Sequence, residues 1–352
     1  MYGKSMSETT RAGRRKTGPS IQDVARLAGV SAQTVSRVST GSDLVKPATR
    51  TRVEHAMHQL GYSPNSMARA LRNGRFGAIG LMAHDFSSTG EVLITEAVVQ
   101  AAEAEGYAVT LVNVANSADG WEGAARRLSN QSIDGLVVIR ADLAASEVLA
   151  LPPGLPVAVS DSRLVGYYPG VGGSQVQGAI DATNHLLGLG HRTVHHLAGP
   201  SDSAPASARL AAWQRTLEDA GLVAPEVFRG DWSAKSGREA GELIAADESV
   251  TAVFCANDEM AVGAMQALHD AGLRVPDDIS IVGFDDIALA EYLWPPLTTV
   301  RQDFLQIGRE LVRLLLHQIS SGVSAQYERT LVPTSLVVRG TTSAPGSARG
   351  SV

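Results

Sequence analysis

The hydrophobic positions of the chain follow two different periods, and the change comes near residue 76. Before it, apolar residues recur at helical spacing in the stretches 20–28, 32–38 and 48–60. After it, short apolar runs such as AIGLMA, GLVVI, AVFCAND and ISIVGFDD alternate with longer amphipathic stretches. This alternation predicts parallel βαβ units with helices on both faces of a sheet. We expect a small all-α head and an α/β body of two doubly wound parallel-sheet subdomains.

Residues 20–38 contain two short helical patterns joined by one glycine. Gly29 supplies the positive-φ position of a tight turn, and Ser31 can cap the second helix. That helix turns its valines inward and leaves polar side chains outside, namely Gln33, Thr34, Ser36 and Arg37. In the DNA major groove, Arg forms paired hydrogen bonds with guanine and Gln with adenine. The pattern is typical of a DNA-recognition helix, although any two short helices joined by glycine share its outline.

The charge distribution favours the DNA-binding interpretation. Residues 1–75 carry a net charge of +9 and the remaining residues carry −15, within an overall charge of −6. A basic head on an acidic body indicates a polyanion-binding module attached to a second domain. The single Cys255 excludes an intramolecular disulfide and fits a reducing compartment. With no signal-peptide pattern and no long apolar run, we expect a cytoplasmic, nucleoid-associated protein without a membrane span.

Several blocks of the sequence together carry a resemblance. They are VARLAGVSAQTVSRV, GYSPNSMARALRNG, LAGPSDSAPASARLAAW, GDWSAKSG, CANDEMAVGAM, DISIVGFDD and PPLTTVRQDF. Over about residues 20–340 the chain resembles the lactose/galactose repressor family of bacterial transcription regulators. The resemblance implies a periplasmic-binding-protein-like body and a repressor whose affinity for operator DNA is switched by a small sugar, of which a galactoside is one example.

The resemblance and the patterns together give the expected domain boundaries. They are a disordered basic tail (1–19), a helix-turn-helix domain (20–64), a hinge helix (65–75), an effector-binding body (76–340) and a disordered tail (341–352). Within the body, one subdomain is expected over about 76–173 plus 304–331, and the other over about 174–303 plus 332–340.

The residues expected to bind DNA lie in the head and the hinge. They are Ser31, Ala32, Gln33, Thr34, Arg37, Asn65 and Leu71. The resemblance implies that Leu71 wedges into the minor groove when the hinge helices of a dimer order on DNA; the alternative is packing against the body. Ala32 replaces a larger base-contacting residue of the family, so the preferred operator is expected to differ.

The residues expected to bind the effector follow the strand-like runs of the body, where ligands of such sheets lie. The resemblance implies the set His84, Asp161, Arg209, Trp232, Asn257, Asp285, Gln302 and Phe304. Carboxylates, amides and an arginine that opens a helix can bridge the hydroxyls of a sugar, and a tryptophan can cover its ring. The alternatives are that Asn257 or Asp258 caps a helix and that Trp232 is core. Asp258 and Asp286 are expected to be structural.

One wall of this site departs from sugar-binding members of the family. His84 replaces a small hydroxyl residue, Asn116 lies near the place of an arginine, and Gly173 lies where an aromatic residue is expected. The identity of the sugar therefore stays open.

Other functions are less consistent with the sequence. An enzyme is not expected, because no nucleophile–base set, phosphate-binding loop or metal-ligand spacing is present, and no cofactor or metal is predicted. His195 and His196 lie in a strand run and are expected to be one core and one surface residue. A secreted sugar-binding transport protein would lack the basic head, and a purine-responsive regulator should have more aromatic residues. Because the chain ends in small residues and not in a leucine heptad, we expect a homodimer on a pseudo-palindromic operator.

Overall fold

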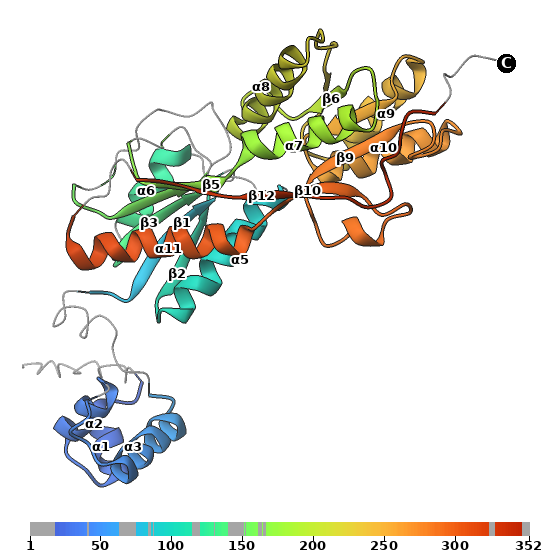
Figure 1. Ribbon diagram of the computed structural model, residues 1–352. Helices are drawn as coiled ribbons and strands as arrows, with labels where there is room; N and C mark the ends of the chain where they lie inside the picture. Colours follow the sequence, from blue (N-terminus) through green and yellow to red (C-terminus); the bar gives the residue numbers. More distant parts are fainter. Residues whose placement is uncertain are drawn as a thin grey trace, which may run out of the picture. The chain divides into compact units, whose positions relative to one another are not determined.

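The structure is a computed structural model (Figure 1). It describes residues 18–40, 42–62, 75–83, 86, 88–114, 120–129, 131–139, 151, 153–160, 164, 167–323 and 328–346. The chain divides into two compact units, residues 1–74 and 75–352, and each is described by itself.

The first unit contains three helices, α1 (Ile21–Ala28), α2 (Ala32–Ser39) and α3 (Pro47–Leu60). A capping box between Ser20 and Asp23 starts α1, and Gly29 ends it with a φ of 63°. One buried valine from each helix, Val24, Val35 and Val53, is fully inaccessible to solvent. These valines lie in a single small core, which holds the helix-turn-helix together.

The first sheet of the body has the strand order β11-β5-β4-β3-β1-β2, and all its strands are parallel. Its strands are β1 (Ala78–Ala83), β2 (Ala108–Asn113), β3 (Gly135–Ile139), β4 (Val157–Ser160), β5 (Gly170–Gly173) and β11 (Arg329–Val332). Helices α5 (Thr89–Ala104) and α11 (Phe304–Ser321) pack on one face, and α6 (Gly120–Ser129) packs on the other.

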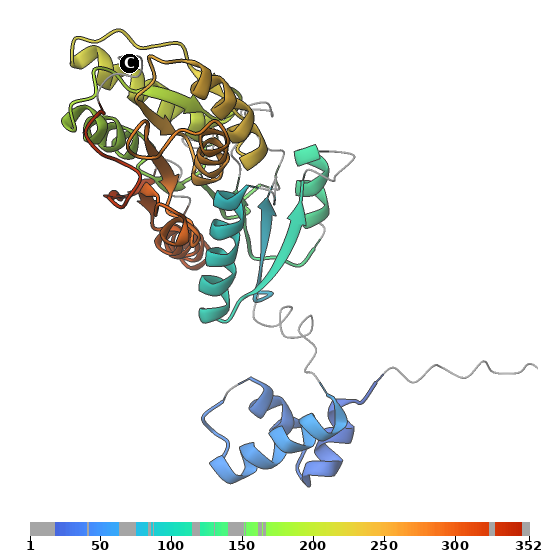
Figure 2. The same cartoon turned by 90° about the vertical axis from the view of Figure 1, so that its right-hand side faces the viewer.

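The second sheet has the order β12-β10-β9-β8-β6-β7. Its strands are β6 (His195–Ala198), β7 (Phe228–Arg229), β8 (Ala252–Cys255), β9 (Ser280–Asp285), β10 (Thr298–Gln302) and β12 (Thr334–Val337). Its helices are α7 (Gln175–Gly188), α8 (Ala204–Asp219), α9 (Ala234–Ala246), α10 (Asp258–Asp270) and the 3-10 turn η1 (Ala290–Tyr292). Figure 2 shows the two layered subdomains of the body from the side. The prediction of two doubly wound α/β subdomains is confirmed.

One strand departs from the predicted parallel pattern. The edge strand β12 is antiparallel to β10. It follows β11, the edge strand of the first sheet, with only Pro333 between them. The chain therefore passes directly from the edge of one sheet to the edge of the other.

The disordered tail predicted from residue 341 is wrong for residues 341–346. Thr341 is fully buried: it accepts a hydrogen bond from Ile281 N (2.8 Å) and its hydroxyl donates to Ile281 O (2.6 Å). Ser343 N donates to Ser280 Oγ (3.0 Å). The small hydroxyl residues that suggested disorder are the groups that attach this segment to β9. Residues 347–352 lie outside the described residues.

The expected division of the two histidines in β6 is also wrong, because both are buried. His195 is 6% exposed and His196 is fully inaccessible. His196 lies between the rings of Phe254 and Trp213, with centroid distances of 4.7 and 5.3 Å. Helices cover the strand on both faces, so neither side of β6 is left at the surface. None of the described helices is long and apolar enough to cross a membrane.

Candidate functional site

The helix α2 presents the polar side chains predicted to contact DNA. Gln33 and Arg37 are exposed, while Ala32 packs partly against the head core. Ser31 caps the helix by accepting a hydrogen bond from Thr34 N (3.2 Å), and the two hydroxyls lie 3.0 Å apart. The tie between Ser31 and Thr34 fixes the first turn and leaves the long side chains to extend from it. Asn65 and Leu71 lie outside the described residues.

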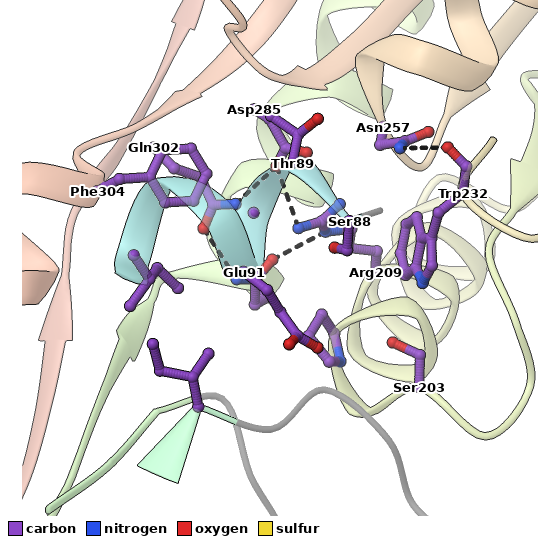
Figure 3. Close-up of a pocket in the computed structure, with 15 residues that line it drawn as sticks. Ser88, Thr89, Glu91, Ser203, Arg209, Trp232, Asn257, Asp285, Gln302 and Phe304 are labelled. Carbon is purple, nitrogen blue, oxygen red and sulfur yellow. Dashed lines mark hydrogen bonds and ion pairs between the residues drawn. The ribbon is translucent and has the colours of Figure 1, made fainter. Parts of the chain in front are cut away.

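A pocket in the body is lined by residues of both subdomains (Figure 3). From the first subdomain it is lined by Ser88, Thr89, Gly90, Glu91, Ile94, Ile139 and Phe304. From the second it is lined by Gln175, Ser203, Pro205, Arg209, Trp232, Asn257, Asp285 and Gln302. The structure thus brings together six of the predicted effector-binding residues; His84 and Asp161 lie outside the described residues.

Parallel strand ends place the acidic and amide groups of this pocket. Asp285 is the last residue of β9 and Gln302 is the last residue of the neighbouring β10. The carboxyl edge of a parallel sheet is where its ligands bind. Asp285 has a φ of 115° and Trp232 a φ of 78°, values that are unusual for side-chain-bearing residues and cluster at functional sites.

Arg209 is the buried charged centre of the pocket, with only 4% of its surface exposed. Its Nε donates to Gln175 Oε1 (2.8 Å), its Nη1 donates to the Ala256 carbonyl, and its Nη2 lies 3.5 Å from Asp285 Oδ1. The guanidinium lies 3.7 Å from the centroid of the Phe284 ring. These contacts use each nitrogen of the guanidinium, so the orientation of its plane is determined.

The position of Arg209 within its helix differs from the prediction. Helix α8 begins at Ala204, so Arg209 lies in the second turn and does not open the helix. Ser203 starts the helix earlier, because its hydroxyl accepts a hydrogen bond from Ala206 N (3.3 Å). Arg209 therefore enters the pocket from the side of the helix.

Asn257 caps a helix, which was one of the alternatives considered for it, and it also lines the pocket. Its Oδ1 accepts from Met260 N (3.0 Å) and so caps α10, while its Nδ2 donates to Trp232 O and Glu259 Oε2. The same side chain lines the pocket. Trp232 is likewise shared, because it lines the pocket and packs against the core formed by α9, α10 and the sheet. Both residues therefore have a structural role and also line the pocket.

Asp258 and Asp286 have structural partners, as expected. Asp258 is fully buried and accepts hydrogen bonds from Thr299 Oγ1 (2.5 Å) and Ile287 N (2.8 Å). Burial, together with the nearby charge of Asp285, raises the pKa of Asp258 well above its ordinary value. Asp286 pairs with Arg301 and Arg339 instead. Neither residue lines the pocket.

Comparisons with known proteins extend over both parts of the chain. Residues 20–65 match the bacterial regulatory proteins of the lacI family, and residues 183–342 match the periplasmic binding protein-like domain. The lactose operon repressor of Escherichia coli (strain K12) is 35% identical over 342 residues, which cover 94% of this chain and 92% of that protein.

The chain belongs to the lacI family of bacterial regulatory proteins. A solved structure of the lac repressor dimer bound to operator and the anti-inducer ONPF superposes with a TM-score of 0.83 at 35% identity, covering 93% of this chain and 100% of that one. A complex of the transcriptional regulator CelR with cellobiose has a TM-score of 0.69 at 32% identity, covering 92% and 99%. As a LacI-family member, the chain is a DNA-binding repressor regulated by a small molecule.

Several pocket residues of this LacI-family chain were not predicted from the sequence. Gln175, Glu91 and Ser203 line the pocket with less than a tenth of their surface exposed. Thr89 of the first subdomain donates a hydrogen bond to Glu259 of the second. These residues lie at or just before the first turn of a helix that follows a strand, and this placement is the signal that could have identified them. Among the described residues, no cluster of three His, Cys, Asp or Glu side chains could hold a metal ion.

Proposed function

We propose that the effector of this repressor is a small, uncharged sugar bound in the pocket between the two subdomains. The observation that carries the proposal is the buried Arg209, fixed beside the carboxylate of Asp285 at the edge of a parallel sheet. A guanidinium and a carboxylate held side by side can donate to and accept from adjacent hydroxyl groups. Trp232 and Phe304 supply apolar surface for the faces of a sugar ring.

The charges around the pocket favour a neutral ligand over a phosphorylated one. Glu91 and Asp285 both line it, and Arg209 is the one cation among its described lining residues. This arginine is already engaged by Asp285. A phosphate group would bring further negative charge next to two carboxylates in a partly desolvated site, which is unfavourable. The similar regulator solved with cellobiose, a neutral disaccharide, supports the same ligand class.

A purine base is a second candidate, because two aromatic side chains line the same pocket. Trp232 and Phe304 offer flat faces on which a planar ring can stack. The sugar is preferred because the buried polar groups of the pocket outnumber these two rings.

We further propose that the repressor acts as a homodimer, as in the solved dimer of its relative on operator DNA. Exposed apolar side chains on and beside η1, namely Leu289, Tyr292 and Trp294, are available for self-association. Two heads would then contact two half-sites of a pseudo-palindromic operator, with Gln33 and Arg37 at base edges and Asn65 and Leu71 at the hinge. Chromosomal DNA as the partner implies action in the cytoplasm, and the body would bind its ligand without transforming it.

The switch requires the effector to bind the two states of the dimer unequally. We propose that a sugar bridging the two subdomains stabilises a closed cleft whose arrangement is incompatible with both heads on the operator. The sugar would then release the repressor from DNA.

A thermal-shift screen tests the ligand class. Glucose, galactose, lactose, cellobiose, glucose 6-phosphate, adenine and hypoxanthine are each added to the full chain. A ligand at 100 times its Kd stabilises the folded state by about 2.7 kcal/mol, which is a readily measured rise in Tm. We expect a neutral sugar to raise Tm and to weaken operator binding. A rise with a purine base alone would establish the second candidate, and a rise with the phosphorylated sugar alone would contradict the charge argument.

A further inference from the structure

A directional chain of hydrogen bonds crosses the wall of the pocket (Figure 3). Arg209 Nε donates to Gln175 Oε1 (2.8 Å), Gln175 Nε2 donates to Gln302 Oε1 (2.9 Å), and Gln302 Nε2 donates to Asp285 Oδ1 (2.7 Å). A guanidinium can only donate and a carboxylate can only accept. The two amides between them are therefore held in one orientation. Exchanging the oxygen and nitrogen of either amide would place one donor against another donor and one acceptor against another acceptor.

The four side chains joined by these hydrogen bonds are buried. Water therefore does not readily replace a hydrogen bond that is lost. Arg209, Asp285, Gln175 and Gln302 are each at most 8% exposed. Leaving a buried donor or acceptor without a partner destabilises the folded protein, because water does not replace the lost hydrogen bond. The amides therefore determine where the guanidinium and the carboxylate present their remaining hydrogen-bonding groups to a ligand.

Gly173, the last residue of β5, leaves the space that these hydrogen-bonded side chains occupy. A Cβ added to Gly173 would overlap Gln302 Oε1, and it would lie 3.2 Å from Gln302 Cδ and 3.3 Å from Gln175 Nε2. The backbone of Gly173 does not have a positive φ, so conformational freedom is not the reason for a glycine here. The bridging amide fills the volume that a side chain at position 173 would occupy.

We propose that Gly173 is a positioning residue of the effector site: its missing side chain lets the Gln302 amide join Gln175 to Asp285. The proposal rests on the pocket being the effector site. A side chain at position 173 displaces the Gln302 amide, which then loses its hydrogen bonds to Gln175 and Asp285. Arg209 and Asp285 then lose their common orientation, and the pair no longer matches adjacent hydroxyls of a neutral sugar. Gln302 acts in the same way, through its neighbours.

A double-mutant cycle in the ligand-free full chain tests the steric link. Gly173→Ala is expected to lower Tm by about 1–2 °C, because a loss of about 1 kcal/mol shifts Tm less in a chain of 352 residues than in a small domain. In the Gln302→Ala background, where the overlapping amide is gone, the same substitution should lower Tm by less than half as much. Gly188→Ala is the matched control, because a Cβ there meets nothing within 4 Å. Equal losses in both backgrounds, or no loss from Gly173→Ala, would overturn the proposal.

Calorimetric titration with lactose and with cellobiose tests the positioning role. For whichever sugar binds the unaltered chain, Gly173→Ala should weaken binding at least tenfold, while operator binding without sugar stays unchanged. Sugar binding as tight as in the Gly188→Ala control would overturn the positioning role. If neither these disaccharides nor glucose and galactose bind the unaltered chain, the proposed ligand class is contradicted, and the ligand-free cycle still decides whether Gly173 makes room for Gln302.

Discussion

At the scale of single residues, the guanidinium of Arg209 is held in the pocket by a fork of contacts that lysine cannot reproduce. Its three nitrogens contact Gln175, Ala256 and Asp285 from one plane. A lysine keeps the charge but has a single ammonium on a flexible stem. We predict that Arg209→Lys still binds the operator but needs at least tenfold more effector to be released. Operator affinity measured across a series of effector concentrations gives the result.

Arg209→Ala is the harsher comparison, because it leaves Asp285 buried without its cation. Removing one partner of a buried pair costs about 3–5 kcal/mol, so Tm should fall as well. A Lys variant that responds to effector at the same concentration as the unaltered chain would show that Arg209 does not hold the ligand.

For Arg37 in the head, a mutation can distinguish a contact to a DNA base from a contact to a phosphate. It is exposed on α2, which Ser31 and Thr34 fix at its first turn. If it pairs with a guanine, Arg37→Ala should cost about 1–3 kcal/mol on the operator and relax the preference at one base position. Arg52→Ala, an exposed arginine on α3, is the control. Equal weakening on operator and random DNA would instead identify Arg37 as a phosphate contact.

The residues that could be predicted were those at strand ends. Asp285 and Gln302 follow apolar runs directly, and the geometry of parallel sheets brings such positions together. Gln175 and Glu91 lie in the first turn of a helix that follows a strand, and this placement marks them as candidates. It does not say whether their side chains face the pocket, because that depends on how each helix packs. The role of Gly173 depends on a side chain 129 positions later in the sequence, Gln302, and no local pattern indicates that contact.

At the scale of elements, β6 makes the stability of the body sensitive to pH. His196 is fully buried, and burial lowers its pKa to about 4. Its Nδ1–H donates to Phe254 O (2.7 Å) in the neutral form. In the unfolded chain, this imidazole binds a second proton and becomes cationic near pH 6.5. Between about pH 6.5 and 4 the unfolded state binds more protons, so the free energy of unfolding should decrease as the pH is lowered through this window.

The measurement is Tm across that pH range for the unaltered chain and for His196→Gln. The variant removes the titrating group and keeps a side-chain donor, so its Tm should fall less steeply with decreasing pH. Burial also lowers the pKa of His185, His191 and His195, and these residues should leave part of the slope in place. Identical slopes for both proteins would show that His196 does not contribute.

Elements with a strong period could be predicted, and those fixed by distant partners could not. The recognition helix and the buried parallel strands each contain enough apolar positions to define a period. Strand β12 and residues 341–346 contain small and hydroxyl residues whose order comes from hydrogen bonds to β10 and β9. For residues 341–346 composition alone suggested disorder, because the partners of their hydroxyls lie some 60 residues away in the sequence, as in the pair of Ser280 and Ser343.

At the scale of the whole molecule, the proposed homodimer needs an interface, and the body has an exposed apolar surface suited to that role. Trp294 is 96% exposed, and Tyr292 and Leu289 are exposed beside it. A groove next to them is lined by Val262 and Met265 of α10 and by Leu273, which follows that helix. Large apolar side chains gathered on one face are typical of interaction surfaces. A two-fold dimer would bury the same patch on both copies.

We predict that Trp294→Asp makes the chain monomeric at concentrations where the unaltered protein is a dimer, because it places a charge at the centre of a desolvated apolar patch. Val223→Asp is the matched control, since Val223 is 90% exposed but is not part of this groove. Sedimentation equilibrium measures the oligomeric state of both variants. The monomer should retain its effector affinity and its Tm with saturating sugar, yet lose most of its operator affinity, because one head contacts only one half-site. A Trp294→Asp protein that remains dimeric and binds the operator normally would place the dimer interface elsewhere on the body.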